Sequence, residues 1–305
     1  MAHPPHPPFQ SSPQVGRDTL LTALAPLLWG TTYLLSSEIL PPERPLTTAT
    51  LRVLPAGLLL LLYCRRWPQG REWWRLGVLA VLNIALFQSL LFVAAARLPG
   101  GVAAVLGAVQ PLLLLALTRV LDARRPPRLA WLGGCGGLAG LAILLLGPAV
   151  AWDAGGVLAA LGGAAGMALG TWLTRRWGGN LPVLATTGWQ LLLGGGLLLP
   201  LALASEAPLP ALSGTQVAAY AYLSLAGSLL AYSLWFRGLA RLSPLAVSGL
   251  GLLSPASASL LGWLVLGQAL GAIAWLGMAV VLASIVLIQW AERAGMPAAG
   301  GAEGR

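Results

Sequence analysis

Residues 86–111 read LFQSLLFVAAARLPGGVAAVLGAVQP, and residues 230–255 read LAYSLWFRGLARLSPLAVSGLGLLSP. The two stretches align without a gap at an offset of 144 residues and share ten identities in 26 positions. The match resumes at Ala130–Gly133 and Ala274–Gly277, which both read AWLG. A leucine-rich composition explains the matched leucines but not the matched Phe, Arg, Pro and Trp. The chain therefore contains two copies of one unit.

The composition is that of an integral membrane protein. Hydrophobic residues make up 57% of the 305 residues and charged residues only 9%, with a mean hydropathy of +0.79. A soluble protein of this length needs a charged surface, which this chain cannot supply. Its apolar runs of about 20 residues match the roughly 30 Å hydrocarbon layer of a bilayer. The lipid bilayer is therefore a predicted partner, and continuous apolar runs favour helices over a β-barrel.

Ten membrane spans are predicted, separated by turn signals rich in Pro, Gly and Arg. They cover residues 19–39, 46–64, 74–96, 100–121, 129–147, 154–175, 182–204, 214–237, 244–266 and 270–290. Since five spans is an odd number, the second copy must be inverted relative to the first, as in many secondary transporters. The predicted fold class is an all-α integral membrane protein with ten transmembrane helices in two inverted five-helix repeats.

Four segments follow from this division of the chain. The two repeats are predicted at 18–147 and 154–290. Residues 1–17 are polar and Pro-rich, so they are predicted to form a disordered N-terminal tail. Residues 291–305 are predicted to form a flexible C-terminal tail.

The arginines predict the orientation in the membrane. All 18 basic residues are Arg, and fifteen of them fall on the side that holds both chain ends. Only Arg44 and Arg97 fall on the opposite side, while Arg52 lies within a span. The positive-inside rule then places both termini of this multi-pass cell-membrane protein in the cytoplasm. Because these residues lie in short loops, the net charge of +9 does not indicate nucleic-acid binding.

Polar side chains at bilayer depth indicate where a substrate binds. Gln110 and Ser254 precede Pro111 and Pro255 in the middle of equivalent spans. A proline frees the carbonyl one turn earlier, and exposed carbonyls beside a polar side chain often bind substrates in transporters. Asn83 is an amide at similar depth that also needs partners. For the prolines themselves, a kink that aids packing explains the sequence equally well.

Span eight carries a polar side chain at every fourth position. This stripe consists of Tyr220, Ser224, Ser228 and Tyr232. It is expected to face a cavity or a neighbouring helix rather than lipid. Hydrogen bonds between helices, worth about 0.6–2 kcal/mol each, explain the stripe equally well. The predicted substrate-binding residues are Trp29, Asn83, Phe87, Gln110, Ser228, Tyr232 and Ser254. The predicted apolar wall consists of Trp29, Phe87, Trp172 and Trp235.

Two ionisable residues lie near one outer side of the membrane. Arg52 is about two turns into span two, and Glu38 ends span one. Groups at similar depth can pair, which lowers the free-energy cost of burying each of them. A structural clasp between the two is favoured over a gate. No acidic residue is predicted at the midplane, so proton coupling through a buried carboxylate has little support.

Small residues are predicted to be helix-packing surfaces. They allow close approach of neighbouring helices in a membrane. The positions concerned are Gly30-Thr31, Gly170-Thr171, Gly133-Gly134, Gly136-Gly137 and Gly194-Gly195-Gly196. For Gly30-Thr31 and Gly170-Thr171, direct contact with a ligand is the alternative to packing.

The segment Leu28–Thr31 (LWGT), the small-residue stripes of spans five and ten and the doubled five-span unit resemble the drug/metabolite transporter superfamily, in particular its EamA-type permeases. The resemblance covers residues 18–290. It implies a ten-helix bundle whose central cavity moves small organic solutes by alternating access, and many members export amino acids or metabolites. Members often carry a Glu nine residues before the Gly that opens the last helix of each half. Arg124 and Gln268 stand at these places here.

The predicted function is that of a secondary transporter, an exporter, which moves small neutral or zwitterionic organic solutes such as amino acids or drug-like metabolites. A phosphorylated substrate would require several convergent cations, and only Arg52 is available in the layer. Motifs for hydrolysis, metal binding and nucleotide binding are missing, so no enzyme activity, cofactor or metal is predicted. The alternative is a membrane-embedded enzyme or lipid-handling protein without transport activity. A channel is a third reading, although no filter sequence appears. The oligomeric state stays open, with a homodimer among the options.

Overall fold

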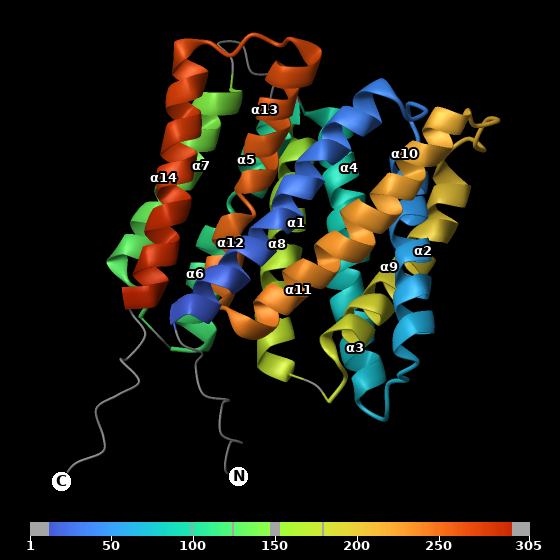
Figure 1. Ribbon diagram of the computed structural model, residues 1–305, viewed down its shortest axis with the longest axis horizontal. Helices are drawn as coiled ribbons and strands as arrows, with labels where there is room; N and C mark the ends of the chain where they lie inside the picture. Colours follow the sequence, from blue (N-terminus) through green and yellow to red (C-terminus); the bar gives the residue numbers. More distant parts are fainter. Residues whose placement is uncertain (1–11, 99, 124, 147–152, 179, 295–305) are drawn as a thin grey trace.

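The computed structural model describes residues 12–98, 100–123, 125–146, 153–178 and 180–294, and this part of the chain contains helices and no strand (Figure 1). The first half consists of α1 (Ser12–Glu38), α2 (Pro45–Cys64), α3 (Glu72–Ala80), η1 (Val81–Leu86), α4 (Phe87–Arg97), α5 (Gly100–Gly107), α6 (Gln110–Leu121) and α7 (Arg128–Leu145). The second half consists of α8 (Ala154–Trp177), α9 (Val183–Ser205), α10 (Gly214–Ser224), η2 (Leu225–Leu230), α11 (Ala231–Arg241), α12 (Pro244–Leu250), α13 (Leu253–Leu266) and α14 (Ala272–Ala294). The segments η1 and η2 are π-helical.

Ten helices of the described chain are long and apolar enough to cross a membrane, which confirms the predicted number of spans. Spans three and eight are continuous through the π-helical segments, from α3 to α4 and from α10 to α11. Spans four and nine each consist of two shorter helices, α5 with α6 and α12 with α13. The protein is therefore a multi-pass membrane protein with five spans in each half.

Two helices extend into the segments predicted to be tails. Helix α1 begins at Ser12, inside the segment predicted to be disordered. Pro13 is the second residue of this helix, where the missing N–H is not needed, and Asp18 anchors the first turns to α11 by ion pairs. Helix α14 continues to Ala294. The rest of the predicted tails and the predicted end of the first repeat at residue 147 lie outside the described residues.

The two halves share their irregularities as well as their helices. The π-helical segments η1 and η2 begin at Val81 and Leu225, which are equivalent positions of the sequence repeat. The break between α5 and α6 follows Gly107, and the break between α12 and α13 contains Gly251, the equivalent residue of the second copy. Pro111 follows the first break, and the equivalent Pro255 follows the second. Neither proline has the backbone N–H that a continuous helix requires. The duplicated unit therefore carries both interruptions.

Equivalent helices of the two halves pack against each other. Helices α2 and α9 meet on one side of the bundle, and α7 and α14 meet on the other (Figure 1). A Cβ atom on Gly57 would lie 2.5 Å from the backbone nitrogen of Leu192, and one on Gly277 would lie 2.5 Å from that of Leu144. Only glycine permits backbones to approach this closely, so small residues bring these helix pairs together.

The predicted glycine packing surfaces are confirmed with one exception. Added Cβ atoms on Gly133, Gly134 and Gly137 would meet side chains of α14, α6 and the break before α13, and those on Gly194 and Gly195 would meet η1 and α2. Gly30 packs against α13 and Gly170 against η1. Gly196 has nothing within 4 Å, because one residue turns a helix by about 100° and carries this position outward. The assignment of Gly196 to a packing surface is wrong.

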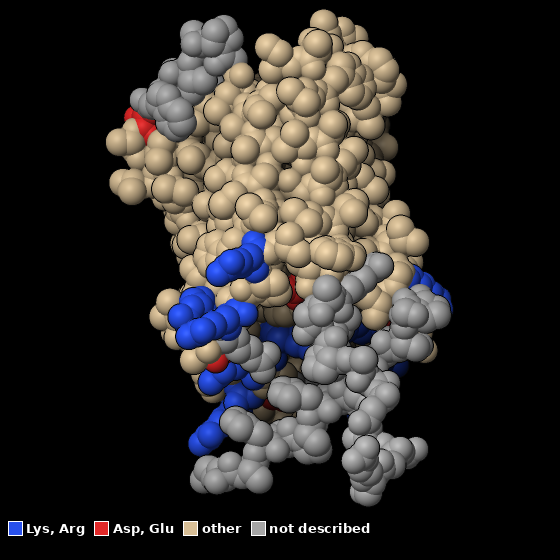
Figure 2. Space-filling model, turned by 90° about the vertical axis from the view of Figure 1, so that its left-hand side faces the viewer, with Lys and Arg blue, Asp and Glu red and all other residues tan. Residues whose placement is uncertain are grey.

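Charged side chains are distributed unevenly between the two ends of the bundle. The start of α1 and the end of α14 lie at the same end of the molecule (Figure 1). On the face shown in Figure 2, the basic side chains gather toward this end, and the opposite end is almost without charge. This distribution agrees with the sequence count of arginines, and the assignment of this end to the cytoplasm stays a prediction.

Candidate functional site

Four of the seven predicted site residues belong to one cluster between the halves. The ring centroid of Trp29, on α1, lies 5.1 Å from that of Tyr232 and 5.1 Å from that of Trp235, both on α11. Phe87 packs against the same buried core. Ser228 lies on η2, one turn before Tyr232, and is fully buried. The first half thus contributes Trp29 and Phe87. The second half contributes Ser228 and Tyr232, together with Trp235, which is not among the seven.

The predicted inward direction of the span-eight stripe is confirmed. Its four residues are at most 6% exposed. The hydroxyl of Tyr220 lies 3.4 Å from that of Thr48 on α2, which is an interhelical hydrogen bond of the kind that burial requires. The role of Ser228 and Tyr232 toward a substrate stays a prediction.

The π-helical segment η2 presents a backbone carbonyl to this cluster. Hydrogen bonds in a π-helix run to the fifth residue, so the regular ladder is interrupted. The N–H of Ala231 donates to the carbonyls of Ala226 and Ser228 and not to the carbonyl of Gly227, its acceptor in a regular α-helix. That oxygen accepts hydrogen bonds from Trp29 Nε1 at 3.0 Å and from Arg52 Nη2 at 3.1 Å. One carbonyl of the second half therefore holds two side chains of the first.

Arg52 joins this cluster, although it is not among the predicted site residues. Its side chain comes from α2, is 7% exposed, and also donates from Nε to Ser228 Oγ at 3.3 Å. The predicted clasp with Glu38 is wrong, because Glu38 ends α1 in an exposed position and Arg52 turns toward η2. Apolar periodicity carries no sign of a π-helical turn, so the acceptor that Gly227 offers could not be foreseen.

Asn83 makes the corresponding contact in the other half. It lies on η1 and donates from Nδ2 to Gln190 Oε1 at 2.8 Å and to Thr174 Oγ1 at 3.4 Å. Both Asn83 and Gln190 are fully buried. Asn83 is thus tied to two helices of the opposite half, α8 and α9. Gln190 is absent from the predicted site, although an amide at bilayer depth is the same signal that singles out Asn83.

The two contacts are related by the internal repeat. Asn83 and Gly227 both lie at the third position of a π-helical segment. Arg52 and Gln190 also hold matching places, because each is the eighth residue of its helix, counted from Pro45 in α2 and from Val183 in α9. Each half therefore reaches from its second span into the π-helical turn of the other half. One half uses a charged side chain for this contact, and the other uses a neutral one.

Gln110 and Ser254 lie apart from the aromatic cluster in the described contacts. Gln110 is the first residue of α6, and its side chain is half-buried. Its Nε2 atom is buried without a hydrogen-bond partner among the described residues. Ser254 lies in the first turn of α13, and its carbonyl accepts from Ser257 Oγ at 3.0 Å. No described hydrogen bond joins the two residues to each other. Both residues follow equivalent helix breaks, and their shared depth and binding role stay predictions.

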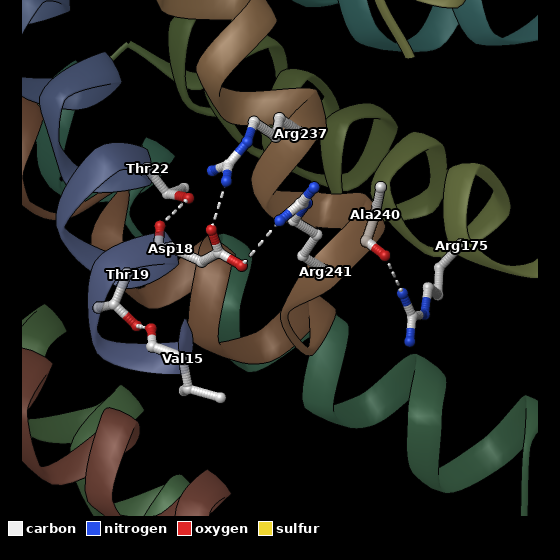
Figure 3. Close-up of polar contacts among 8 residues, drawn as sticks. All are labelled: Val15, Asp18, Thr19, Thr22, Arg175, Arg237, Ala240 and Arg241. Carbon is white, nitrogen blue, oxygen red and sulfur yellow. Dashed lines mark hydrogen bonds and ion pairs between the residues drawn. The ribbon is translucent and has the colours of Figure 1, made fainter. Parts of the chain in front are cut away.

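Ion pairs join the halves at the end where both termini lie. Asp18 on α1 is 3% exposed and pairs with Arg237 at 2.5 Å and with Arg241 at 3.6 Å, both on α11 (Figure 3). Thr22 donates to the carbonyl of Asp18. Beside them, Arg175 on α8 donates to the carbonyl of Ala240 at 3.0 Å. A buried carboxylate of the first half is thereby held by two arginines of the second.

A related pair joins the halves at the opposite end. Arg97, which ends α4, lies 3.6 Å from Asp153, the N-cap residue of α8. Arg97 and Arg241 are equivalent by the repeat, and each pairs with a carboxylate near the start of the other half's first helix. The Arg97–Asp153 pair is 57% and 46% exposed, whereas Asp18 is almost fully enclosed. The ion pairs at the end that holds both termini are therefore the more deeply buried of the two sets.

The chemistry available to these residues is non-covalent. In the part of the chain that the structure describes, no group of three or more His, Cys, Asp or Glu residues is placed to hold a metal ion. The cluster offers aromatic side chains, a guanidinium and a hydroxyl, and an ion pair joins the halves at each end of the bundle.

Comparisons with known proteins agree with this geometry. The profile of the EamA-like transporter family matches residues 18–146 and 154–290. Protein PecM from Dickeya dadantii (strain 3937) is 40% identical over 269 residues, which cover 87% of this chain and 90% of that protein. The uncharacterized inner membrane transporter YedA from Escherichia coli (strain K12) is 30% identical over 271 residues, covering 86% and 87%.

A solved crystal structure shows the same fold. It superposes with a TM-score of 0.79 and covers 92% of this chain and 98% of its own. The two sequences are 19% identical, so the likeness concerns the arrangement of the helices.

Proposed function

The chain belongs to the EamA-like transporter family, and from this premise we propose that it is a secondary transporter that exports small neutral or zwitterionic organic solutes by alternating access. Amino acids and drug-like metabolites are the proposed cargo. The observation that carries the proposal is the pairing of the halves at both ends, through Asp18 and Arg241 at one end and Arg97 and Asp153 at the other.

The two ion pairs support alternating access because they use equivalent arginines at opposite faces. Both pairs are formed in this structure, and if one half rocks against the other about the bundle centre, one pair would separate while the other stays closed. The exposed Arg97–Asp153 pair is worth about 0–1 kcal/mol and separates easily. The Asp18 cluster is enclosed and resists separation, because a buried charge requires its partners. The proposal accordingly assigns the more stable contact between the halves to the end that holds both termini.

The lining of the cluster supports an uncharged or zwitterionic cargo with an apolar portion. Trp29, Tyr232 and Trp235 offer aromatic faces, and Arg52 is the one cation whose described contacts bring it to the cluster. A polyanion would require several cations. Export is proposed because many members of the group that the sequence resembles are exporters. No catalytic step is assigned to the protein.

Flux in proteoliposomes tests the proposal. The purified full-length protein is reconstituted, and the efflux of a radiolabelled panel (phenylalanine, tryptophan, threonine and an aromatic amine) is measured against protein-free vesicles. Saturable efflux of at least one solute, accelerated by the same solute on the opposite side, is the expected result. If a reconstituted reference exporter works and none of the panel moves, the proposed cargo is wrong. If solute enters inside-out vesicles no faster than right-side-out vesicles, the export direction is wrong.

A further inference from the structure

The guanidinium of Arg52 lies inside the bilayer without a described counter-charge. Arg52 is the eighth residue of α2, which places it about 10 Å along the helix. The ion pairs of the described residues involve Arg97, Arg176, Arg237 and Arg241, and none involves Arg52. An arginine in the middle of a membrane helix raises the insertion free energy by about 2.5–3.5 kcal/mol. Such residues persist where they serve a substrate or ion pathway.

One edge of this guanidinium is already occupied and the other is available. Nε donates to Ser228 Oγ, and one hydrogen of Nη2 points to the carbonyl of Gly227. Among the described residues, no acceptor is bonded to Nη1. One Nη1 hydrogen and the second Nη2 hydrogen form the end-on edge of the planar group. Two parallel N–H donors along this edge match the two oxygens of a carboxylate.

The residues around Arg52 are suited to the remainder of such a molecule. Trp29 shares the Gly227 carbonyl with Arg52, so its indole is held next to the guanidinium. Tyr232 lies beside Trp29, with the two ring centroids 5.1 Å apart. An apolar or aromatic group attached to a carboxylate would therefore lie against these rings.

We propose that Arg52 binds the carboxylate of the transported solute by its end-on edge, with the solute's apolar portion against Trp29 and Tyr232. This inference rests on the proposed function and names the chemical class of the cargo: an organic acid or zwitterion with one carboxylate. The single carboxylate neutralises the single guanidinium. A dianionic phosphate would leave a net negative charge at bilayer depth.

The equivalent position in the other half supports a single anionic group. Gln190 occupies the place of Arg52 there and is neutral, and its amide oxygen is engaged by Asn83. The repeat therefore offers one cation at this depth rather than two. The cargo binds asymmetrically, with its acidic end toward α2 and η2.

The experiment compares probes that differ only at the carboxylate or the amine. Binding of 3-phenylpropionate, L-phenylalanine, L-phenylalaninamide and 2-phenylethylamine to the detergent-purified protein is measured by thermal shift, and flux of the same probes is measured in proteoliposomes. The variants are Arg52→Gln, Arg52→Lys and the control Arg44→Gln, whose side chain bonds to loop carbonyls at the outer surface. Wild type and R44Q are expected to bind the two carboxylate probes at least tenfold more tightly than the amide and the amine. R52Q is expected to lose this tenfold preference, and R52K to keep part of it.

Each outcome decides between the inference and the function on which it rests. Equal binding of carboxylate probes by wild type and R52Q, or no carboxylate-dependent binding by wild type, overturns the inference. Wild-type flux of the amine and the amide at the rate of phenylalanine leaves the transporter standing and overturns the inference alone. Arg52-dependent binding without flux of any probe supports the site and overturns the proposed transport of these solutes. If R52Q does not fold, R52K decides, because a lysine keeps the charge but loses the paired donors.

Discussion

Arg52 and Gln190 stand at equivalent positions of the two halves, and each bonds to the π-helical turn of the opposite half. Arg52 reaches Gly227 and Ser228 on η2, and Gln190 reaches Asn83 on η1. Since Asn83 and Gly227 are themselves equivalent, one cross-half contact occurs twice. The repetition makes the halves interlock at the centre, where one contact is charged and the other neutral.

Replacing Gln190 by Leu should destabilise the neutral contact. The Nδ2 group of Asn83 would lose its 2.8 Å acceptor in a site that is fully buried. The free energy of unfolding should fall by about 1–2 kcal/mol, within the range for an unpaired buried polar group. Thermal unfolding in detergent measures the change. The double variant Asn83→Leu/Gln190→Leu should be closer to wild type than the sum of the two single variants. Strict additivity would mean that the hydrogen bond between the two amides contributes nothing.

Replacing Asp18 by Asn should open the inner end. Arg237 and Arg241 would then face each other without the enclosed carboxylate. The unfolding free energy should fall by about 2 kcal/mol, less than for a fully buried pair because both arginines are partly exposed. Position 22 reports the opening, because Thr22 is fully buried. In a background without Cys64 and Cys135, the thiol introduced by Thr22→Cys should become reactive to a water-soluble reagent when Asp18→Asn is added.

The matched control for this variant is Asp153→Asn at the outer end. That pair is exposed, and an asparagine side-chain oxygen can still accept the N-cap hydrogen bond from the N–H of Gly156. Its unfolding free energy should therefore change by less than about 1 kcal/mol. Equal losses in D18N and D153N, or a thiol at position 22 that stays unreactive in D18N, would show that the inner cluster is not a closed gate.

Replacing Gly57 by Ala should separate α2 from α9. The new Cβ would lie 2.5 Å from a backbone nitrogen, which cannot move without shifting α9. Overpacking of this kind costs about 1–3 kcal/mol of stability. Gly196→Ala is the control on α9, since nothing lies within 4 Å of its Cβ, and it should be neutral or stabilising by up to about 1 kcal/mol. Similar melting temperatures for G57A and G196A would contradict the close approach of α2 and α9.

Reporter fusions should place both ends of the helical bundle in the cytoplasm. A fluorescent protein fused after Ala294 should fluoresce, and an alkaline phosphatase fused there should be inactive, because the arginines concentrate at this end. Fusions within the loop after α4 should give the opposite result. Active phosphatase after Ala294 would show that the orientation is the reverse of the predicted one. The assignment of the inner and outer ion pairs would then be exchanged.

The sequence predicts the scaffold well because the bilayer restricts it. Apolar length indicates the spans, the arginine counts predict their direction, and the repeat at residues 86 and 230 predicts inversion. The structure confirms the ten spans and the interruptions near Pro111 and Pro255.

The site is less accessible to sequence reasoning, because its contacts depend on helix phase. The acceptor that Gly227 offers to Arg52 exists only where the backbone departs from α-helical hydrogen bonding, and composition carries no signal for this departure. The expected clasp with Glu38 follows from depth alone, and depth says nothing about the direction of a side chain. Gln110 and Ser254 are predicted to share a depth on the same basis, although no described hydrogen bond joins them to the cluster.

The π-helical turns also determine where the ends of their spans point. A wider turn inserts an extra residue, and each residue of an α-helix corresponds to a rotation of about 100°. Everything after Leu230 is therefore rotated by that amount relative to an uninterrupted helix, including Arg237 and Arg241. Deleting one residue of η2 would turn both arginines away from Asp18 without touching either charge. The ion pairs of Asp18 with these two arginines therefore depend on the number of residues in η2, which lies about two to three helical turns away along the same span.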